Sequence, residues 1–296
     1  MNALIVVRTV ADLRRAVGDF RKAGRTVGLI PTMGALHAGH VSLVQGALDR
    51  GDVPVASIFV NPTQFGPNED FAAYPRGETD DFARLEVAGC RIAFAPGVDE
   101  MYPGPGPQLT TVTVGGSITE GLCGPFRPGH FQGVATVVLK LFEIAQPRFA
   151  YFGRKDAQQA RILRQMARDL DLDTQLVVRP IVREPDGLAL SSRNAYLQEG
   201  SRRAATALYR SLEAVRDEIA AGERDPARLL GKLRSVLQAE PGVAIDYAEI
   251  VDAETLEPVV NLRGKCLVLL AAVVGKTRLI DNALIEQENG GFKVSL

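Results

Sequence analysis

The fold of this chain is most constrained by short, almost wholly apolar segments that alternate with segments of helical character. Residues 27–30 form one apolar run, residues 40–50 have the composition of a helix, and residues 53–60 are again mainly apolar. A strand that is buried on both faces reads as a nearly continuous apolar run, because helices cover both sides of a parallel sheet. The succession therefore predicts a β-α-β unit, and an α/β fold built on a doubly wound parallel sheet.

The same pattern continues along the chain and then changes. Further strands are predicted at residues 91–95, 148–152 and 174–180. The cluster Glu184-Pro185-Asp186-Gly187 has the composition of a turn, and we place a domain boundary there. Two amphipathic helices and two strands predicted beyond it fit a smaller α+β C-terminal domain. The expected division is residues 1–184, residues 185–285 and a tail, residues 286–296, that shows no periodicity and is expected to be mobile.

Composition narrows the class of protein. The chain has 296 residues, of which 46% are hydrophobic, so it can bury a substantial core. Its 34 basic and 35 acidic residues give a net charge of −1, which provides no electrostatic argument for a nucleic-acid or membrane partner. The scattered Cys90, Cys123 and Cys266 do not form a disulfide framework, and no apolar stretch has the length of a membrane span. We expect a cytoplasmic protein with small-molecule ligands.

Two of the three histidines lie in one segment between a predicted strand and a predicted helix. It reads Ile30-Pro31-Thr32-Met33-Gly34-Ala35-Leu36-His37-Ala38-Gly39-His40. A neutral histidine can donate one hydrogen bond, and a helix N-terminus offers unpaired N–H groups and partial positive charge. The glycines let the backbone approach a ligand, so the segment predicts a phosphate site. Two histidines on an ordinary surface turn remain an alternative; zinc is disfavoured, since no cysteine pair or carboxylate cluster accompanies them.

Three more loops follow predicted strands or the predicted domain boundary, at residues 61–68, 153–156 and 190–193. Cationic and hydroxyl side chains suited to phosphate are Lys155, Ser191, Ser192 and Arg193, and amides suited to hydroxyl or carboxylate groups are Gln64 and Gln159. Each loop taken alone is also typical of a surface turn, a helix cap or a solvated side chain. The sequence by itself does not show that the loops converge.

The motifs carry a resemblance to a known family. They are Pro31 to His40, Phe59-Val60-Asn61-Pro62-Thr63-Gln64-Phe65, Phe152-Gly153-Arg154-Lys155-Asp156 with Gln158-Gln159, and Leu190-Ser191-Ser192-Arg193-Asn194. In this order, over nearly the whole chain, they resemble the signatures of the pantothenate synthetase family. The histidine motif alone also resembles the wider His-x-Gly-His superfamily of adenylyl-transferring enzymes, which includes class I aminoacyl-tRNA synthetases. The glutamine loop and the Gly-x-Lys-Asp segment narrow the resemblance to the synthetase.

The resemblance implies a reaction and an architecture. The reaction is ATP-dependent condensation of (R)-pantoate with β-alanine to give pantothenate, AMP and pyrophosphate through an enzyme-bound pantoyl adenylate, with Mg²⁺ accompanying ATP. The architecture is a Rossmann-like N-terminal domain, a smaller C-terminal lid domain and a homodimer.

The resemblance also assigns residues. The residues implied to contact ATP are Met33, Gly34, Ala35, Leu36, His37, Ala38, Gly39, His40, Gly153, Arg154, Lys155, Asp156, Val182, Leu190, Ser191, Ser192 and Arg193. Of these, His37, His40 and Lys155 are expected to be catalytic. Gln64 and Gln159 are expected to hold pantoate, with Gln64 also lying towards β-alanine.

Some positions leave questions open. The family usually has Glu where this chain has Arg154, so the role of that carboxylate is in doubt here. Asp80 and Asp81 resemble a proposed magnesium-associated site, but Arg84 makes a metal there uncertain. Two other functions stay open: a related nucleotidyltransferase acting on a phosphorylated pantetheine, and a Rossmann module that senses ATP without reacting it.

Overall fold

The computed structural model describes residues 3–67, 69–104, 109–288 and 290–296, so Asn68 of the predicted loop lies outside the described residues. Two compact units are present. Unit 1 comprises residues 1–115, 126–153 and 159–180, and unit 2 comprises residues 116–125, 154–158 and 181–296. The predicted division after residue 184 lies close to the last crossing, but it gives all of residues 1–184 to one domain and stays a prediction.

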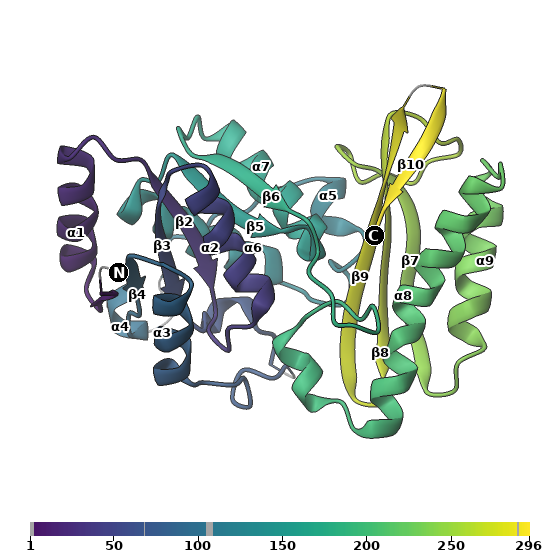
Figure 1. The fold of residues 1–296 in the computed structure, drawn as a ribbon, viewed down its shortest axis with the longest axis horizontal. Coiled ribbons are helices and arrows are strands. Elements are labelled where there is room, and N and C mark those ends of the chain that lie inside the picture. Colours follow the sequence, from purple (N-terminus) through teal and green to yellow (C-terminus); the bar gives the residue numbers. More distant parts are fainter. Residues whose placement is uncertain (1–2, 68, 105–108, 289) are drawn as a thin grey trace. The chain divides into compact units, whose positions relative to one another are not determined.

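Unit 1 is built on a parallel sheet (Figure 1). Among the described residues this sheet has six strands, in the order β1 (Ile5–Val7), β4 (Ile92–Phe94), β3 (Val53–Ile58), β2 (Val27–Thr32), β5 (Phe149–Gly153) and β6 (Gln175–Arg179). Every neighbouring pair is parallel. The chain runs outward from β2 through β3 to β4, and returns to the other side of β2 with β5. The carboxyl ends of β2 and β5 therefore flank a topological switch point, where open α/β sheets bind ligands.

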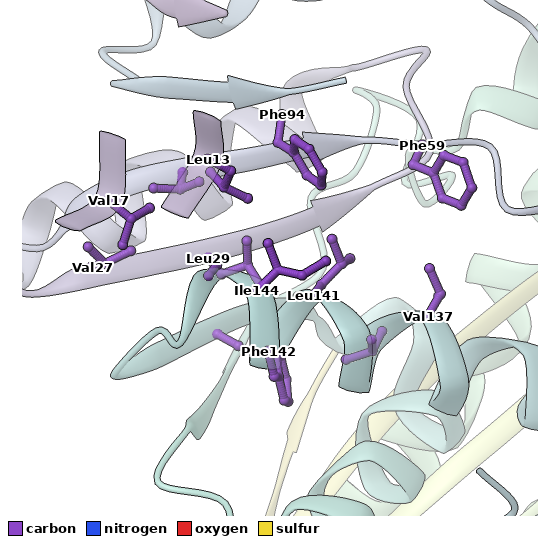
Figure 2. Packing of buried hydrophobic residues seen from close by; sticks show 14 of the residues in the cluster. Leu13, Val17, Val27, Leu29, Phe59, Phe94, Val137, Leu141, Phe142 and Ile144 are labelled. Carbon is purple, nitrogen blue, oxygen red and sulfur yellow. The ribbon is translucent and has the colours of Figure 1, made fainter. Parts of the chain in front are cut away.

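Helices cover both faces of this sheet. They include α1 (Val10–Lys22), α2 (Ala38–Asp49), α3 (Glu78–Val87), α6 (His130–Ala145) and α7 (Ala157–Asp169), with a short α4 (Val98–Met101). Consecutive β2 residues enter different apolar clusters: Leu29 packs in the cluster that contains residues of α1 and α6, and Ile30 in the one that contains residues of α2 and α3. Figure 2 shows Leu141 and Ile144 of α6 beside Leu29 in the first cluster. This two-sided packing confirms the predicted Rossmann-like, doubly wound sheet.

The α6 helix is apolar on almost every side, and most of its residues are buried. A helix with this composition is stable only inside a protein, because each fully buried Leu or Phe contributes roughly 1.5–3 kcal/mol relative to an exposed one. Its position is consequently fixed by packing. The loop that precedes it is fixed at that end as well.

Unit 2 contains a separate antiparallel sheet. Among the described residues its four strands lie in the order β10 (Gly291–Ser295), β9 (Thr277–Glu288), β8 (Lys265–Val274) and β7 (Val243–Asp252). The amphipathic helices α8 (Glu199–Ala220) and α9 (Pro226–Gln238) pack their apolar residues into one cluster with this sheet. This arrangement confirms the predicted α+β character of the C-terminal part. None of the described helices combines the length and apolar character that crossing a membrane requires.

The C-terminal tail that was predicted from residue 286 contains parts of two strands. Strand β9 continues to Glu288, and β10 pairs with it in antiparallel register from Gly291–Glu288 to Ser295–Leu284. Phe292 and Val294 of β10, and Leu296 just beyond it, alternate along the chain and pack against the core of unit 2. The alternation is only three apolar residues long, so no clear periodicity is visible in the sequence alone.

Candidate functional site

The histidine segment joins β2 to α2, and each of its two rings caps the start of that helix. The Gly39 N–H donates to His37 Nδ1 at 3.1 Å, and the His37 N–H donates to His40 Nδ1 at 3.3 Å. The ring centroids lie 4.2 Å apart. Because Nδ1 accepts in both rings, a neutral ring carries its proton on Nε2. Both histidines are thus arranged as Nε2–H donors at a helix N-terminus, which suits a phosphate ligand.

The turn before these histidines depends on a buried carboxylate of α3. Gly34 and Ala35 are both left-handed, with φ of 82° and 50°. Asp81, 3% exposed, accepts hydrogen bonds from the N–H groups of Ala35 at 2.9 Å and Leu36 at 2.7 Å. A Cβ on Gly34 would lie 2.9 Å from Asp81 Oδ2 and 3.2 Å from Ile58 Cγ2, so this position requires glycine. Burial raises the pKa of Asp81, and the two N–H bonds act in the opposite direction.

The magnesium-associated site suggested for Asp80 and Asp81 does not fit this geometry. Each oxygen of Asp81 is engaged by a backbone amide, whereas Asp80 is exposed. Within the described ranges of the chain, no three His, Cys, Asp or Glu side chains gather where they could hold a metal ion. Asp81 therefore stabilises the turn by accepting hydrogen bonds from its backbone.

Replacement of Asp81 by Asn should destabilise this turn. The amide keeps the shape of the carboxylate, but it turns an NH₂ group towards one of the two N–H donors, which leaves that donor unsatisfied at a cost of about 1–3 kcal/mol. We expect a lower melting temperature and faster hydrogen exchange at the Ala35 and Leu36 amides. Asp80→Asn, on the exposed neighbour, is the matched control and should change neither. Equal effects of the two variants would contradict the assignment.

Gln64 lies in the turn η1 (Pro62–Gln64) that follows β3, and it is 8% exposed. Asn61 Nδ2 donates to Gln64 Oε1 at 3.1 Å, and Tyr102 Oη donates to Asn61 Oδ1 at 2.7 Å. The Gln64 Nε2 group donates to Met33 Sδ at 2.8 Å. The structure therefore brings together Met33, predicted to contact ATP, and Gln64, predicted to hold pantoate.

A line of hydrogen bonds supports the backbone of Gln64. Arg127 pairs with both carboxylate oxygens of Glu69, at 3.0 and 2.6 Å, and its Nη1 lies 2.8 Å from His130 Nε2. An arginine can only donate, so His130 Nε2 accepts and Nδ1 carries the proton. That Nδ1 group lies 2.8 Å from the Gln64 carbonyl oxygen and donates to it. The third histidine of the chain thus positions the glutamine turn.

Close packing adds to this support. Gly133 of α6 lies against η1 so closely that a Cβ there would overlap the Thr63 carbonyl oxygen and come within 2.7 Å of Gln64 Cα. Sequence reasoning missed the supporting roles of Asn61, Tyr102 and His130. The available signal was a histidine in a distinctive Pro- and Gly-containing loop just before an almost wholly apolar helix.

Lys155 lies in unit 2, in the turn η2 (Arg154–Asp156) that follows β5. Asn282 of β9 donates from Nδ2 to the carbonyl oxygens of Arg154 at 2.8 Å and Lys155 at 3.0 Å. The neighbouring Asp281 is fully buried and pairs with Arg183 at 2.7 and 3.0 Å. Burial raises the pKa of Asp281, while the charges of Arg183 and Lys155 act to lower it. The backbone of the lysine turn is therefore fixed by β9.

The loop at residues 190–193, whose side chains were predicted to bind phosphate, also has defined hydrogen bonds within unit 2. The Leu190 N–H donates to the Val182 carbonyl oxygen at 3.0 Å, which places these two predicted ATP contacts side by side. Ser191 Oγ accepts from the Arg193 N–H at 3.3 Å and caps the turn η3 (Ser192–Tyr196). Ser191, Ser192 and Arg193 are thus presented by one capped turn.

The adjacent glutamines of α7 differ in their surroundings. Gln158 is 5% exposed; its Oε1 accepts from the Cys123 N–H at 3.0 Å, and its Nε2 donates to the carbonyl oxygens of Ile118 at 3.0 Å and Gly121 at 2.9 Å. Gln158 therefore holds the segment around the short helix α5 (Ser117–Glu120) within unit 2. Gln159 is only partly buried and belongs to unit 1, as does Gln64.

The family model for pantoate-beta-alanine ligase matches residues 5–284, a range that contains every predicted site residue. The chain belongs to this family. It is 50% identical over 283 residues to the pantothenate synthetase of Geobacter sulfurreducens, which covers 96% of this chain and 99% of the relative. It is 49% identical over 280 residues to the pantothenate synthetase of Thermotoga neapolitana, covering 95% and 99%.

Solved structures of the pantoate-beta-alanine ligase family share the fold. Pantothenate synthetase from Thermus thermophilus superposes with a TM-score of 0.89 at 46% identity, covering 94% of this chain and 98% of the other. The ligase from Francisella tularensis, complexed with beta-gamma ATP and beta-alanine, has a TM-score of 0.76 at 34% identity and covers 95% and 97%. Strand β10 lies beyond the range that matches the family model.

Proposed function

We propose that the protein is a pantothenate synthetase, which condenses (R)-pantoate with β-alanine at the expense of ATP and releases pantothenate, AMP and pyrophosphate. Membership of the pantoate-beta-alanine ligase family supports this reaction, as does a relative complexed with beta-gamma ATP and beta-alanine. The structural observation that carries the proposal is the pair His37 and His40. Their Nδ1 atoms accept from backbone amides, so a neutral ring carries its proton on Nε2, and these N–H groups at the start of α2 are proposed to donate to the phosphates of ATP.

The first step activates the acid, because a free carboxylate does not react with an amine. A carboxylate oxygen of pantoate attacks the α-phosphorus of ATP, and the bond from that phosphorus to the bridging oxygen breaks. Pyrophosphate leaves with the electron pair. Donors fixed in advance stabilise charge that develops in this transition state. We assign that task to His37 and His40, and neutralisation of the departing pyrophosphate to Lys155.

The remaining contacts with ATP are proposed for other residues that the resemblance assigns to it. These are Met33, Gly34, Ala35, Leu36, Ala38, Gly39, Gly153, Asp156, Val182, Leu190, Ser191, Ser192 and Arg193. Mg²⁺ is expected to accompany ATP and to supply charge neutralisation on its phosphates. Because Asp81 is committed to the turn before His37, we assign no protein ligand to this ion.

The second step forms the amide. The neutral amine of β-alanine attacks the acyl carbon of pantoyl adenylate, the carbon–oxygen bond to AMP breaks, and the amine loses a proton. Formation of the mixed anhydride divides one difficult reaction into two easier ones. The adenylate is held without a covalent bond to the protein: Cys90 is buried, and burial raises the pKa of its thiol to about 11. Ser191 caps a turn and has no role as a nucleophile in this scheme.

Pantoate is proposed to be held by Gln64 and Gln159. The Gln64 amide donates to Met33 Sδ, and a thioether sulfur is a weak acceptor. A hydroxyl or carboxylate oxygen of pantoate is a better acceptor for the same group. Fixed by Asn61, the Gln64 side chain needs little rearrangement to make that exchange.

Gln159→Ala should raise the KM for pantoate much more than the KM for ATP. A site that hydrogen-bonds a substrate is left with unpaired polar groups when one partner is removed, and the expected loss is about tenfold or more. Steady-state kinetics with each substrate varied in turn measures the effect. Gln165→Ala, at a partly buried position further along the same helix, is the control. A larger change for ATP than for pantoate would move Gln159 to the nucleotide.

Isotope exchange tests the two-step reaction. Enzyme, ATP, Mg²⁺ and pantoate should exchange labelled pyrophosphate into ATP when β-alanine is absent, because the adenylate forms and reverses on its own. Exchange without pantoate would favour another nucleotidyltransferase activity. Exchange only with β-alanine, or formation of ADP, would contradict the adenylate mechanism, and absence of any turnover would favour an ATP-sensing module.

The protein is further proposed to be cytoplasmic, and to be a homodimer as the family resemblance implies. The free, buried Cys90, Cys123 and Cys266 suit a reducing compartment.

A further inference from the structure

The turn that carries Lys155 makes a contact with the last strand of the chain. Arg154 Nη2 donates to the carbonyl oxygen of Ser295 in β10 at 3.0 Å. Strand β10 lies beyond residues 5–284, the range that matches the family model. The contact therefore joins the turn that carries Lys155 to a part of the chain outside that range.

Burial and the neighbouring charges affect the Arg154 guanidinium that makes this contact. Burial lowers the pKa of the Arg154 guanidinium, and the neighbouring charge of Arg183 acts in the same direction, whereas Asp281 and Glu286 act to raise it. A partly buried cation of this kind needs acceptors in place of water. The Ser295 carbonyl supplies one at hydrogen-bonding distance.

A second connection leads from β10 to the same turn through β9. The register pairs Ser295 with Leu284, and Asn282 lies two positions before Leu284 on β9. Asn282 is 0% exposed and donates to the carbonyl oxygens of Arg154 and Lys155. By pairing with β9 next to Asn282, β10 supports the residue that holds the lysine turn.

Strand β10 is itself firmly anchored in unit 2. Phe292 and Val294 pack against the apolar core, and the Arg224 guanidinium lies 5.3 Å from the centre of the Phe292 ring. The Ser295 carbonyl is consequently a fixed acceptor. The Arg154 guanidinium is therefore restrained at Nη2 by an acceptor in the strand.

We propose that Arg154 and β10 together position Lys155 for pyrophosphate departure. Arg154 is a positioning residue in this proposal: it acts by fixing the backbone of the η2 turn, and touches β10 instead of the reacting phosphates. The inference rests on the role proposed for Lys155 in the ligase reaction. It replaces, for this chain, the direct contact between Arg154 and ATP that the family resemblance implies.

A double-mutant cycle separates positioning from a general loss of stability. In the full-length protein, Arg154→Ala should slow pantoate-dependent pyrophosphate exchange about tenfold, with the KM for pantoate unchanged. In a Lys155→Met background the same change should cause no further loss, because Arg154 acts only through Lys155. Such non-additivity is typical of coupled residues, whereas independent effects multiply. Equal losses in both backgrounds would overturn the proposal.

Removal of β10 provides a second test. A chain ending at Glu288 should lose at least as much activity as Arg154→Ala, and adding Arg154→Ala to it should change nothing more. Lys293→Ala, on the exposed side of β10, is the control and should behave as wild type. Should the shortened chain fail to fold, the full-length cycle with Lys155→Met decides alone. Wild type lacking pantoate-dependent exchange would refute the proposed function; active wild type with a fully active Arg154→Ala variant would refute only this inference.

Discussion

Lys155→Ala should lower the rate of adenylate formation by about 10³-fold, the upper end of the range for loss of one donor that acts in a transition state. The physical reason is that pyrophosphate departs with additional negative charge, which the ammonium group neutralises. Single-turnover formation of AMP-linked product, or initial rates of pyrophosphate exchange, measures the loss. ATP affinity should change less, because the charge on the leaving group is larger in the transition state than in bound ATP.

Two further variants at this position define what Lys155 contributes. Lys155→Met keeps the length of the side chain and removes its charge, so it should be as impaired as Lys155→Ala. Lys155→Arg keeps the charge, but a planar guanidinium places it differently from a compact ammonium, so severe impairment is expected there too. An Arg154→Ala defect as deep as that of Lys155→Ala would contradict the assignment.

His40→Ala should reduce kcat by on the order of 10²-fold or more, with a smaller change in ATP affinity. The substitution removes the Nε2–H donor proposed to stabilise charge on the phosphates as pantoate attacks. It also removes the Nδ1 acceptor that caps α2 through the His37 N–H. Steady-state kinetics and ATP binding, measured on the same preparation, distinguish a transition-state effect from weakened binding.

Two amide variants separate the cap from the chemistry. The side-chain oxygen of Asn reaches about as far as Nδ1, so His40→Asn can keep the cap and should restore the melting temperature, but not kcat. His40→Gln reaches as far as Nε2 and should recover part of the activity. Wild-type kcat in His40→Asn would show that His40 serves only as a cap. An intact kcat with a large loss of ATP affinity would likewise contradict a transition-state role.

The parallel sheet could be predicted from the sequence because a strand that is buried on both faces has a characteristic local composition. Strands β2 and β3 are nearly continuous apolar runs, each followed by a turn. Strand β9 is not a continuous apolar run, because it includes Asp281 and Asn282, which are both buried. The Asp281 carboxylate pairs with Arg183, and the Asn282 Nδ2 group donates to the η2 carbonyl oxygens, partners that are distant in sequence. Without the fold, such a segment reads as a polar loop.

The candidate site shows the same limit. His37 and His40 cap a helix that begins within the same segment, so their spacing could be recognised in the sequence. Asp81 binds the histidine turn from 45 and 46 positions away, and His130 supports Gln64 from 66 positions away. Local patterns contain no information about such pairs. These two pairs became visible only in the fold, which places α3 beside the histidine turn and α6 beside the glutamine turn.

Gly133 has a consequence for attempts to alter which acid the protein accepts. With no room for even one methyl group between α6 and the Thr63 carbonyl oxygen, this side of the glutamine turn behaves as a fixed wall. A mutant library that varies Gly133 should return glycine among its active members, whereas the adjacent exposed Gln132 should tolerate many replacements. For the pantoate site proposed at Gln64, redesign is therefore best directed at Met33, whose flexible thioether accepts a hydrogen bond from the Gln64 amide.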